Sequence, residues 1–219
     1  MELRDALRGT GAVRRFTNAP VDDATVAAVL DDARFAPSGG NRQPWSVVAV
    51  RDQATRTRLR ELYVPSWENY LDVQGATPLL SMDEPPEGIS PMRLRMIKRA
   101  DRFARTIDEV PLHLIVCARL DALAVVDADL PRPSIVGGGS IYPFVQNILL
   151  GLRQEGVGAS LTTLITPAEP QVRELLSLPD DVGIAALVAA GYPGEPWPTK
   201  LSRRPVEEFA FGEKWGEPL

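Results

Sequence analysis

The residues best suited to chemistry in this chain lie between 36 and 45, which read Ala-Pro-Ser-Gly-Gly-Asn-Arg-Gln-Pro-Trp. They follow a stretch with helical spacing and precede an apolar run, so they link a helix to a strand. Glycines let the backbone approach a ligand closely. The amides of Asn41 and Gln43 both donate and accept hydrogen bonds, which suits the edge of a heterocycle. The alternative is that proline and glycine simply end the helix.

Basic residues form two further clusters, Arg14 with Arg15 near one end of the chain and Lys200, Arg203 and Arg204 near the other. The 219 residues carry a net charge of −5, which argues against a general nucleic-acid surface. Clusters of cations in an acidic protein predict local anion sites, although a solvated surface is the common alternative.

Other kinds of site are excluded by composition. Cys117 is the only cysteine and His113 the only histidine, so we expect no disulfide and no metal site. Both lie in one apolar run without a nucleophile motif, where we expect a structural histidine and an inert thiol. No apolar run has the ~20 residues needed to span a bilayer, and the first residues lack a signal-peptide pattern. We therefore expect a cytoplasmic protein with no membrane or nucleic-acid partner.

The apolar pattern predicts a single domain over residues 1–219, with a central sheet covered by helices on both faces. Asp22 is a candidate N-cap. The predicted helices span residues 22–35, 53–71 with an interruption near Pro65, about 140–152 and 168–177. The predicted strands span residues 46–51, 112–118, 157–164 and 183–191.

Three segments do not fit this alternation. Residues 63–108 contain a proline-rich stretch and read as a helical excursion, either a lid over an active site or an insertion without function. The glycines at 137–139 read as a flexible link or a tight packing site, because no phosphate-loop motif surrounds them. Residues 195–219 combine proline, charge and aromatics, and such a tail requires a surface to cover it.

Taken together, the loop, Arg14-Arg15-Phe16, the turn Gly191-Tyr192-Pro193 and the basic segment ending at Pro205 resemble the nitroreductase family of FMN-dependent oxidoreductases. The resemblance implies an α+β, three-layer α-β-α fold with a mixed, mainly antiparallel sheet. It also implies a homodimer with FMN at the interface, and residues 195–219 reaching the partner subunit.

The resemblance implies which residues hold FMN. The phosphate requires guanidinium groups, for which Arg14, Arg203 and Arg204 are the first candidates and Arg15 and Lys200 the next. The loop is implied to contact the ring and the ribityl chain from the second subunit, with Gln43 pinning it and Trp45 either packing beneath it or stacking on the flavin. The implied cofactor-binding residues are Arg14, Arg15, Pro37, Ser38, Gly39, Asn41, Thr163, Leu164, Arg203 and Arg204.

The implied catalytic residues are Thr162 and Thr163. Many relatives place a Glu-Gly pair near flavin N5, and this chain has two threonines there, which is similar to the iodotyrosine deiodinase-like branch. In a second departure, Thr10-Gly11-Ala12-Val13-Arg14 stands where the family has further basic residues and a serine. Tyr63, Trp67, Tyr70 and Arg95 are candidate contacts for the acceptor, and the three aromatic residues equally form a helix packing face.

The resemblance therefore predicts an oxidoreductase that passes hydride or electrons from NAD(P)H to a small electron-poor acceptor by a ping-pong mechanism. A flavin-storage protein with little turnover and a reductive dehalogenase-like enzyme are the alternatives.

Overall fold

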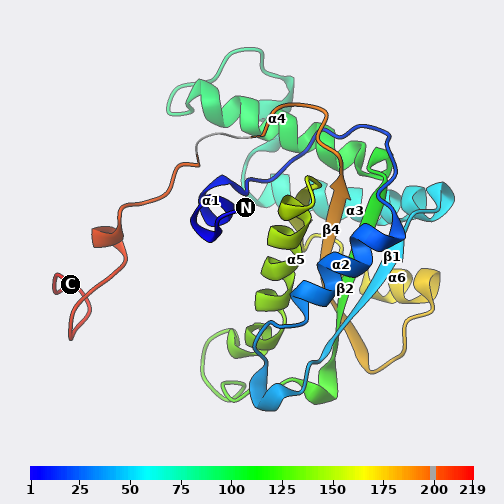
Figure 1. Cartoon of the computed structure of the whole chain (residues 1–219). Coiled ribbons are helices and arrows are strands. Elements are labelled where there is room, and N and C mark those ends of the chain that lie inside the picture. Colours follow the sequence, from blue (N-terminus) through cyan, green and yellow to red (C-terminus); the bar gives the residue numbers. More distant parts are fainter. Residues whose placement is uncertain (198–200) are drawn as a thin grey trace.

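The computed structural model describes residues 1–197 and 201–219 of the chain (Figure 1). Lys200 lies outside the described residues. The α-helices are α1 (Leu3–Gly9), α2 (Asp23–Ala33), α3 (Gln53–Val73), α4 (Pro91–Arg105), α5 (Tyr142–Gln154) and α6 (Glu169–Leu176). The strands are β1 (Trp45–Val50), β2 (Leu112–Arg119), β3 (Gly158–Thr162) and β4 (Val182–Gly191).

The four strands form one sheet in the order β1-β2-β4-β3, and all three pairings are antiparallel. The predicted mixed sheet is therefore wrong for the described residues, because each strand runs opposite to the strands beside it, and β2 and β3, which point the same way, are separated by β4. Trp45 lies opposite Ala118 at one end of the sheet, and Gly158 lies opposite Gly191 at the other.

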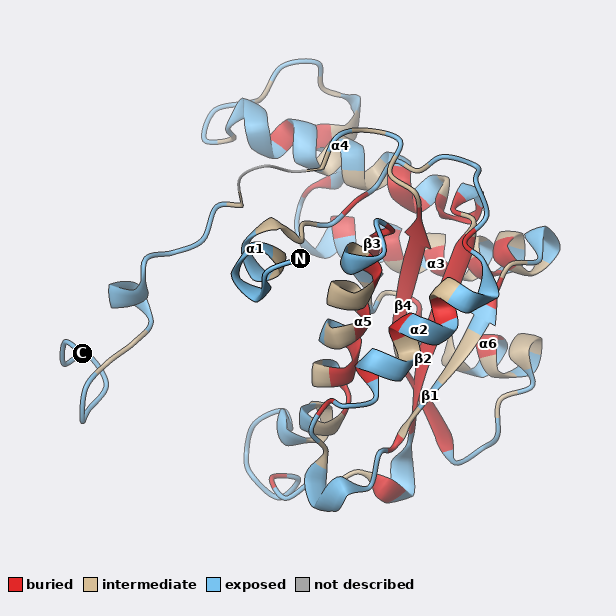
Figure 2. Cartoon of the chain, in the orientation of Figure 1, coloured by how far each residue is buried: buried red, intermediate tan, exposed pale blue. Residues whose placement is uncertain are grey.

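Helices cover both faces of this sheet, which confirms the three-layer α-β-α arrangement. One core packs α2 and α5 against side chains such as Leu114 and Val188, and the other packs α3, α4 and α6 against side chains such as Ile115 and Leu187. β2 and β4 are buried along almost their whole length (Figure 2). Their continuous apolar runs predicted this burial.

Most predicted elements are confirmed to within two residues at each end. The start of α2 follows from chemistry, because the Asp22 side chain accepts a hydrogen bond from the Thr25 N–H at 2.6 Å. The same cap recurs at α3, where Asp52 accepts from Thr55, and at α4, where Ser90 accepts from Arg93.

The predicted interruption of the second helix at Pro65 is wrong, since α3 runs unbroken through it. Pro65 lies on the exposed side, where the carbonyl that loses its helical partner is accessible to solvent. Tyr63, Trp67 and Leu71 are buried on the other side. Their packing holds both halves of the helix on one axis.

Residues 63–108 thus comprise the second half of α3, a short 3-10 helix at Thr77–Ser81, a turn and α4. Their buried residues belong to the same core as Ile115 and Leu187. A role as a lid stays a prediction.

His113 and Cys117 are structural, as expected. His113 is completely buried and its Nε2 lies 2.8 Å from the Ile107 carbonyl oxygen. Burial lowers its pKa to about 4, so the imidazole is neutral at pH 7. Burial likewise raises the pKa of Cys117 to about 11, which keeps the thiol protonated.

Residues 13–17 lie across the ends of β3 and β4. The Val13 N–H donates to the Ala159 carbonyl at 2.9 Å and the Thr17 N–H to the Tyr192 carbonyl at 2.8 Å. Gly158 makes this approach possible, because a Cβ there would lie 2.9 Å from the Val13 side chain. The contact fixes the backbone that carries Arg14.

The last residues, 201–219, extend away from the body of the chain (Figure 1). Phe209 and Trp215 are exposed on this arm. That it reaches a partner subunit stays a prediction.

We expect Gly158→Ala to lower the free energy of unfolding by ~1–3 kcal/mol, because the added methyl group overpacks against Val13. Urea unfolding measures this. Gly139→Ala is the matched control, since no atom lies within 4 Å of a Cβ at that position. Equal unfolding midpoints for the two variants would show that residues 13–17 are not held by this contact.

Candidate functional site

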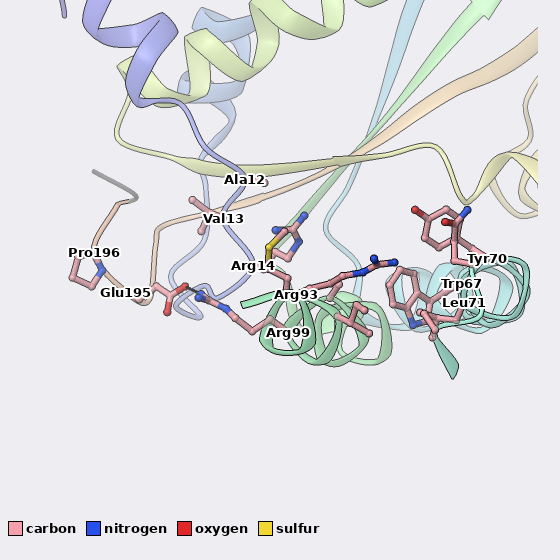
Figure 3. A pocket seen from close by; sticks show the side chains of 15 residues that line it. Ala12, Val13, Arg14, Trp67, Tyr70, Leu71, Arg93, Arg99, Glu195 and Pro196 are labelled. Atoms are coloured by element: carbon pink, nitrogen blue, oxygen red, sulfur yellow. Dashed lines mark hydrogen bonds and ion pairs between the residues drawn. The ribbon is translucent and has the colours of Figure 1, made fainter. Parts of the chain in front are cut away.

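The main candidate site is a cavity of about 480 Å³ between α3, α4 and residues 12–14 (Figure 3). Trp67, Tyr70 and Leu71 line it from α3, and Arg93, Met96 and Arg99 line it from α4. Glu195 and Pro196 complete the rim. Residues far apart in the sequence therefore share one hollow beside the end of the sheet.

Arg14 enters this cavity from the N-terminal segment. Arg14 is exposed at the rim of the cavity, and its side chain makes no hydrogen bond or ion pair with any residue that the structure describes. Crowding by surrounding protein lowers the pKa of its guanidinium; nearby Tyr63 opposes this shift, and the positive charge of Arg99 adds to it. A guanidinium held this way favours an anionic ligand, which would replace the water it has lost.

Two hydroxyl groups meet close to Arg14. The Tyr63 Oη on α3 lies 3.1 Å from the Thr162 Oγ1 at the end of β3, and the Leu164 N–H donates to the same Oγ1 at 3.2 Å. The phenol is the better donor of the two hydroxyls. When it donates, both lone pairs of Thr162 are used and the threonine proton is free to donate to a ligand.

Burial raises the pKa of Tyr63, although Thr162 and Arg14 oppose the shift. Tyr63 therefore stays protonated and remains a donor at pH 7. Its packing role was predicted, but its bond to Thr162 was not. The two residues are 99 positions apart, and no local sequence pattern joins them.

Thr163 has a different environment from Thr162. Its side chain is exposed, and its carbonyl accepts from the Thr166 N–H at 3.0 Å and the Thr166 hydroxyl at 2.8 Å. The structure thus gives Thr162 the bonded, oriented hydroxyl.

The loop at residues 36–45 is internally braced. The Gln43 N–H donates to the Ser38 Oγ at 3.0 Å, and the Gln43 side chain donates to the Asn41 Oδ1 at 3.2 Å. Asn41 and Gln43 both adopt positive φ, 53° and 48°, which asparagine tolerates better than most residues. Gln43 therefore pins the loop, as one of its two predicted roles required.

Two contacts seat the loop on the α5 side of the sheet. The Gly39 N–H donates to the Ser140 Oγ at 3.0 Å, and Trp45 stacks on Phe144 with ring centroids 4.7 Å apart. Trp45 thus packs beneath the loop. Of the three glycines before α5, Gly138 is a tight packing site, since a Cβ there would lie 2.8 Å from the Tyr142 ring, whereas no atom lies within 4 Å of a Cβ at Gly139.

Not all predicted site residues meet within one chain. Arg14, Thr162 and Tyr63 lie together, and Leu164 adjoins them. The loop lies at the other end of the sheet, where Trp45 pairs with Ala118. Arg203 and Arg204 are exposed on the C-terminal arm, and Arg203 donates only to its neighbour Ser202, at 2.8 Å, among the described residues.

Arg15 differs from Arg14 in having a carboxylate within reach. It is exposed, and its nearest carboxylate is Glu195, at 3.9 Å. Glu195 also pairs with Arg99. Glu195 therefore pairs with two cations, Arg15 and Arg99. Arg14 forms no ion pair within the part of the chain that the structure describes.

No group of three or more His, Cys, Asp and Glu side chains that could hold a metal ion occurs among residues 1–197 and 201–219. In the same residues, no helix is both long enough and apolar enough to cross a membrane.

Comparison with known proteins identifies the family and the fold. The nitroreductase family model matches residues 7–192. NADH dehydrogenase of Thermus thermophilus is 27% identical, covering 89% of this chain and 88% of its own. A BluB-like flavoprotein from Clostridium difficile 630 superposes with a TM-score of 0.71 at 21% identity, covering 98% of this chain and 100% of its own. Oxidized iodotyrosine deiodinase bound to FMN and 3-iodo-L-tyrosine gives 0.69 at 22% identity, covering 94% and 96%.

We expect the hydroxyl pair to show measurable coupling. In a double-mutant cycle with Tyr63→Phe and Thr162→Val, the free energies of unfolding should deviate from additivity by ~0.5–1.5 kcal/mol, because each single change removes the same hydrogen bond. The hydrogen bond from the Leu164 N–H to Thr162 is lost in both variants that carry Thr162→Val, so its contribution cancels in the cycle. Tyr70→Phe, at an exposed ring on the same helix, replaces Tyr63→Phe in the control cycle and should give no coupling.

Proposed function

The chain belongs to the nitroreductase family, and on that premise we propose that it is an FMN-dependent oxidoreductase that uses NAD(P)H to reduce a small electron-poor acceptor. The unpaired Arg14 guanidinium beside the Tyr63–Thr162 hydroxyl pair carries this proposal. A cation without a partner fits an anionic cofactor, and an oriented hydroxyl fits the mixed donors and acceptors of a flavin edge. When bound, the flavin supplies the hydride chemistry.

The chain's own residues bind and orient in this scheme. Arg14 neutralises negative charge on the cofactor, and Arg15, Arg203 and Arg204 are the further candidates for its phosphate. Thr162 donates its free proton to the cofactor, and Tyr63 holds that hydroxyl in one orientation. Thr163 and Leu164 line the same edge through their backbone. Reductant and acceptor use the cavity in turn, which gives ping-pong kinetics.

We further propose a homodimer in which Pro37, Ser38, Gly39 and Asn41 of one subunit complete the site of the other. The distance of the loop and of Arg203 from Arg14 within one chain supports this. So do the apolar side chains on the C-terminal arm, which lack a covering surface in the described chain.

A reductive dehalogenase is the second candidate. It is favoured by the Thr162 hydroxyl and by the likeness to iodotyrosine deiodinase. A flavin-storage protein is the third. Purified protein that is yellow and bleaches with NADH or NADPH supports the oxidoreductase. Colour without bleaching supports storage or another reductant, and a colourless protein that cannot be loaded with FMN contradicts all three.

We expect Arg14→Gln to weaken FMN binding by ~10–100-fold, because one charge-assisted hydrogen bond contributes ~1.5–3 kcal/mol. Flavin fluorescence titration measures the dissociation constant. Arg34→Gln is the control, since Arg34 is exposed at the C-cap of α2 and pairs with Asp31. An unchanged constant for Arg14→Gln would reject its role.

We expect subunit mixing to restore FMN sites. Arg14→Gln and Asn41→Gly chains are each deficient, and Gly keeps the positive φ of residue 41. When the two chains are unfolded and refolded together, half of the dimers should be mixed. Each mixed dimer places both changes in one site and leaves the other site intact, so about a quarter of all sites should bind FMN. No recovery would show that the loop does not act on the partner's cofactor.

A further inference from the structure

α4 is a strongly cationic element in an acidic protein. Its 15 residues, PMRLRMIKRADRFAR, contain six Lys and Arg side chains and one acid, Asp101. The whole chain carries a net charge of −5. Positive charge is therefore concentrated on α4, of which Arg93 and Arg99 line the cavity.

Three of these six cations form ion pairs with carboxylates. Lys98 lies 3.9 Å from Asp83, Arg99 pairs with Glu195, and Arg105 pairs with Asp101 and Glu68. Arg93, Arg95 and Arg102 form no ion pair within residues 1–197 and 201–219. Of these three, only Arg93 lines the main cavity.

Arg93 is exposed, and on the cavity side it lies near aromatic and apolar side chains. Figure 3 shows its side chain extending from α4 toward Trp67 and Tyr70 of α3, whereas Arg99 points toward Glu195. The two rings stack with centroids 5.8 Å apart. The Trp67 indole N–H donates to Asp101 at 2.9 Å, so its one polar atom is already satisfied, and Met96 and Ile97 add further apolar surface.

This arrangement specifies a ligand chemistry. A planar guanidinium binds a carboxylate through two parallel hydrogen bonds, and aromatic walls favour a flat apolar body. A single guanidinium, that of Arg93, matches a single negative charge better than a phosphate dianion, because Arg99 is already paired with Glu195 and Arg14 enters the cavity from the N-terminal segment.

We propose that the acceptor reduced by this enzyme is an aromatic carboxylate, whose ring packs against Trp67 and Tyr70 and whose carboxylate binds Arg93. This inference rests on the proposed function and names its substrate class. Arg93 is a specificity determinant here and takes no part in the hydride transfer.

Paired acceptors test the proposal in the flavin-loaded enzyme. The enzyme should reduce 4-nitrobenzoate with a higher kcat/KM than 4-nitrobenzamide, which has the same ring and no charge. Arg93→Gln should lower kcat/KM for the benzoate by ~10–100-fold, mainly through KM, and leave the benzamide unchanged. Arg95→Gln, two residues away on the same helix but outside the cavity lining, should behave as the parent.

A binding measurement separates this inference from the proposed function. Calorimetric titration of the protein with 2-naphthoate and 2-naphthamide needs no reductant. Naphthoate should bind more tightly, and Arg93→Gln should abolish the difference. If the protein takes up no flavin but binds naphthoate more tightly than naphthamide, the proposed function is contradicted and the carboxylate site at Arg93 is supported. If flavin turnover is normal but naphthoate and naphthamide bind with equal affinity, only the proposed carboxylate site at Arg93 is overturned.

The same variant distinguishes other sources of negative charge. Arg93→Gln should retain FMN and keep its KM for NADH and NADPH. A loss of FMN, or a rise in either KM with 4-nitrobenzoate unaffected, would assign Arg93 to a cofactor phosphate and overturn the proposal.

Discussion

The candidate site depends on a steric condition at the edge of the sheet, where Val13 occupies the space that a side chain at residue 158 would fill. Val13 is buried, and its N–H is bonded to Ala159. The bridge between Phe16 and Pro193 holds the same segment three residues later. Between these two fixed points Arg14 has little freedom along the sheet. The glycine therefore determines where the cation stands, although it contacts no ligand.

The cations around the cavity fall into two groups, those that are paired with a carboxylate and those that are not. Arg99 and Arg15 share Glu195, so one negative charge offsets part of their two positive charges, and exposed pairs of this kind contribute little to stability. Arg14 and Arg93 have no such partner in the described chain. Arg93 is exposed to solvent. Arg14 is partly surrounded by protein and has lost some of its water without gaining a counter-ion, which raises the free energy of the empty protein. An anionic ligand removes that penalty, which is how an acidic protein can attract anions at one place.

The sequence predicts the layers of this fold well because its strands are continuous apolar runs and its helices have caps. Asp22 and the run at 112–118 illustrate both signals. It fails at Pro65, where local propensity predicts a break and burial of Tyr63 and Trp67 overrides it. It also fails for the bond between Tyr63 and Thr162, since only the register of β3 on β4 brings that hydroxyl under α3. Short-range patterns predict elements, whereas a site assembled from distant segments requires the packing.

The loop at residues 36–45 was the strongest sequence signal, and its own hydrogen bonds limit what it can offer a ligand. The backbone N–H groups of Gly39, Asn41 and Gln43 are bonded within the chain. The Asn41 Oδ1 accepts from Gln43, so the amide nitrogen of Asn41 is the group left to point outward. A loop braced this way loses little entropy on meeting a ligand. β2 alone, at ~3.3 Å per residue, separates it from Arg14 by ~25 Å. If both act on one cofactor, as we propose, the second copy of the chain must supply one of them, and dimer formation then becomes a condition for cofactor binding.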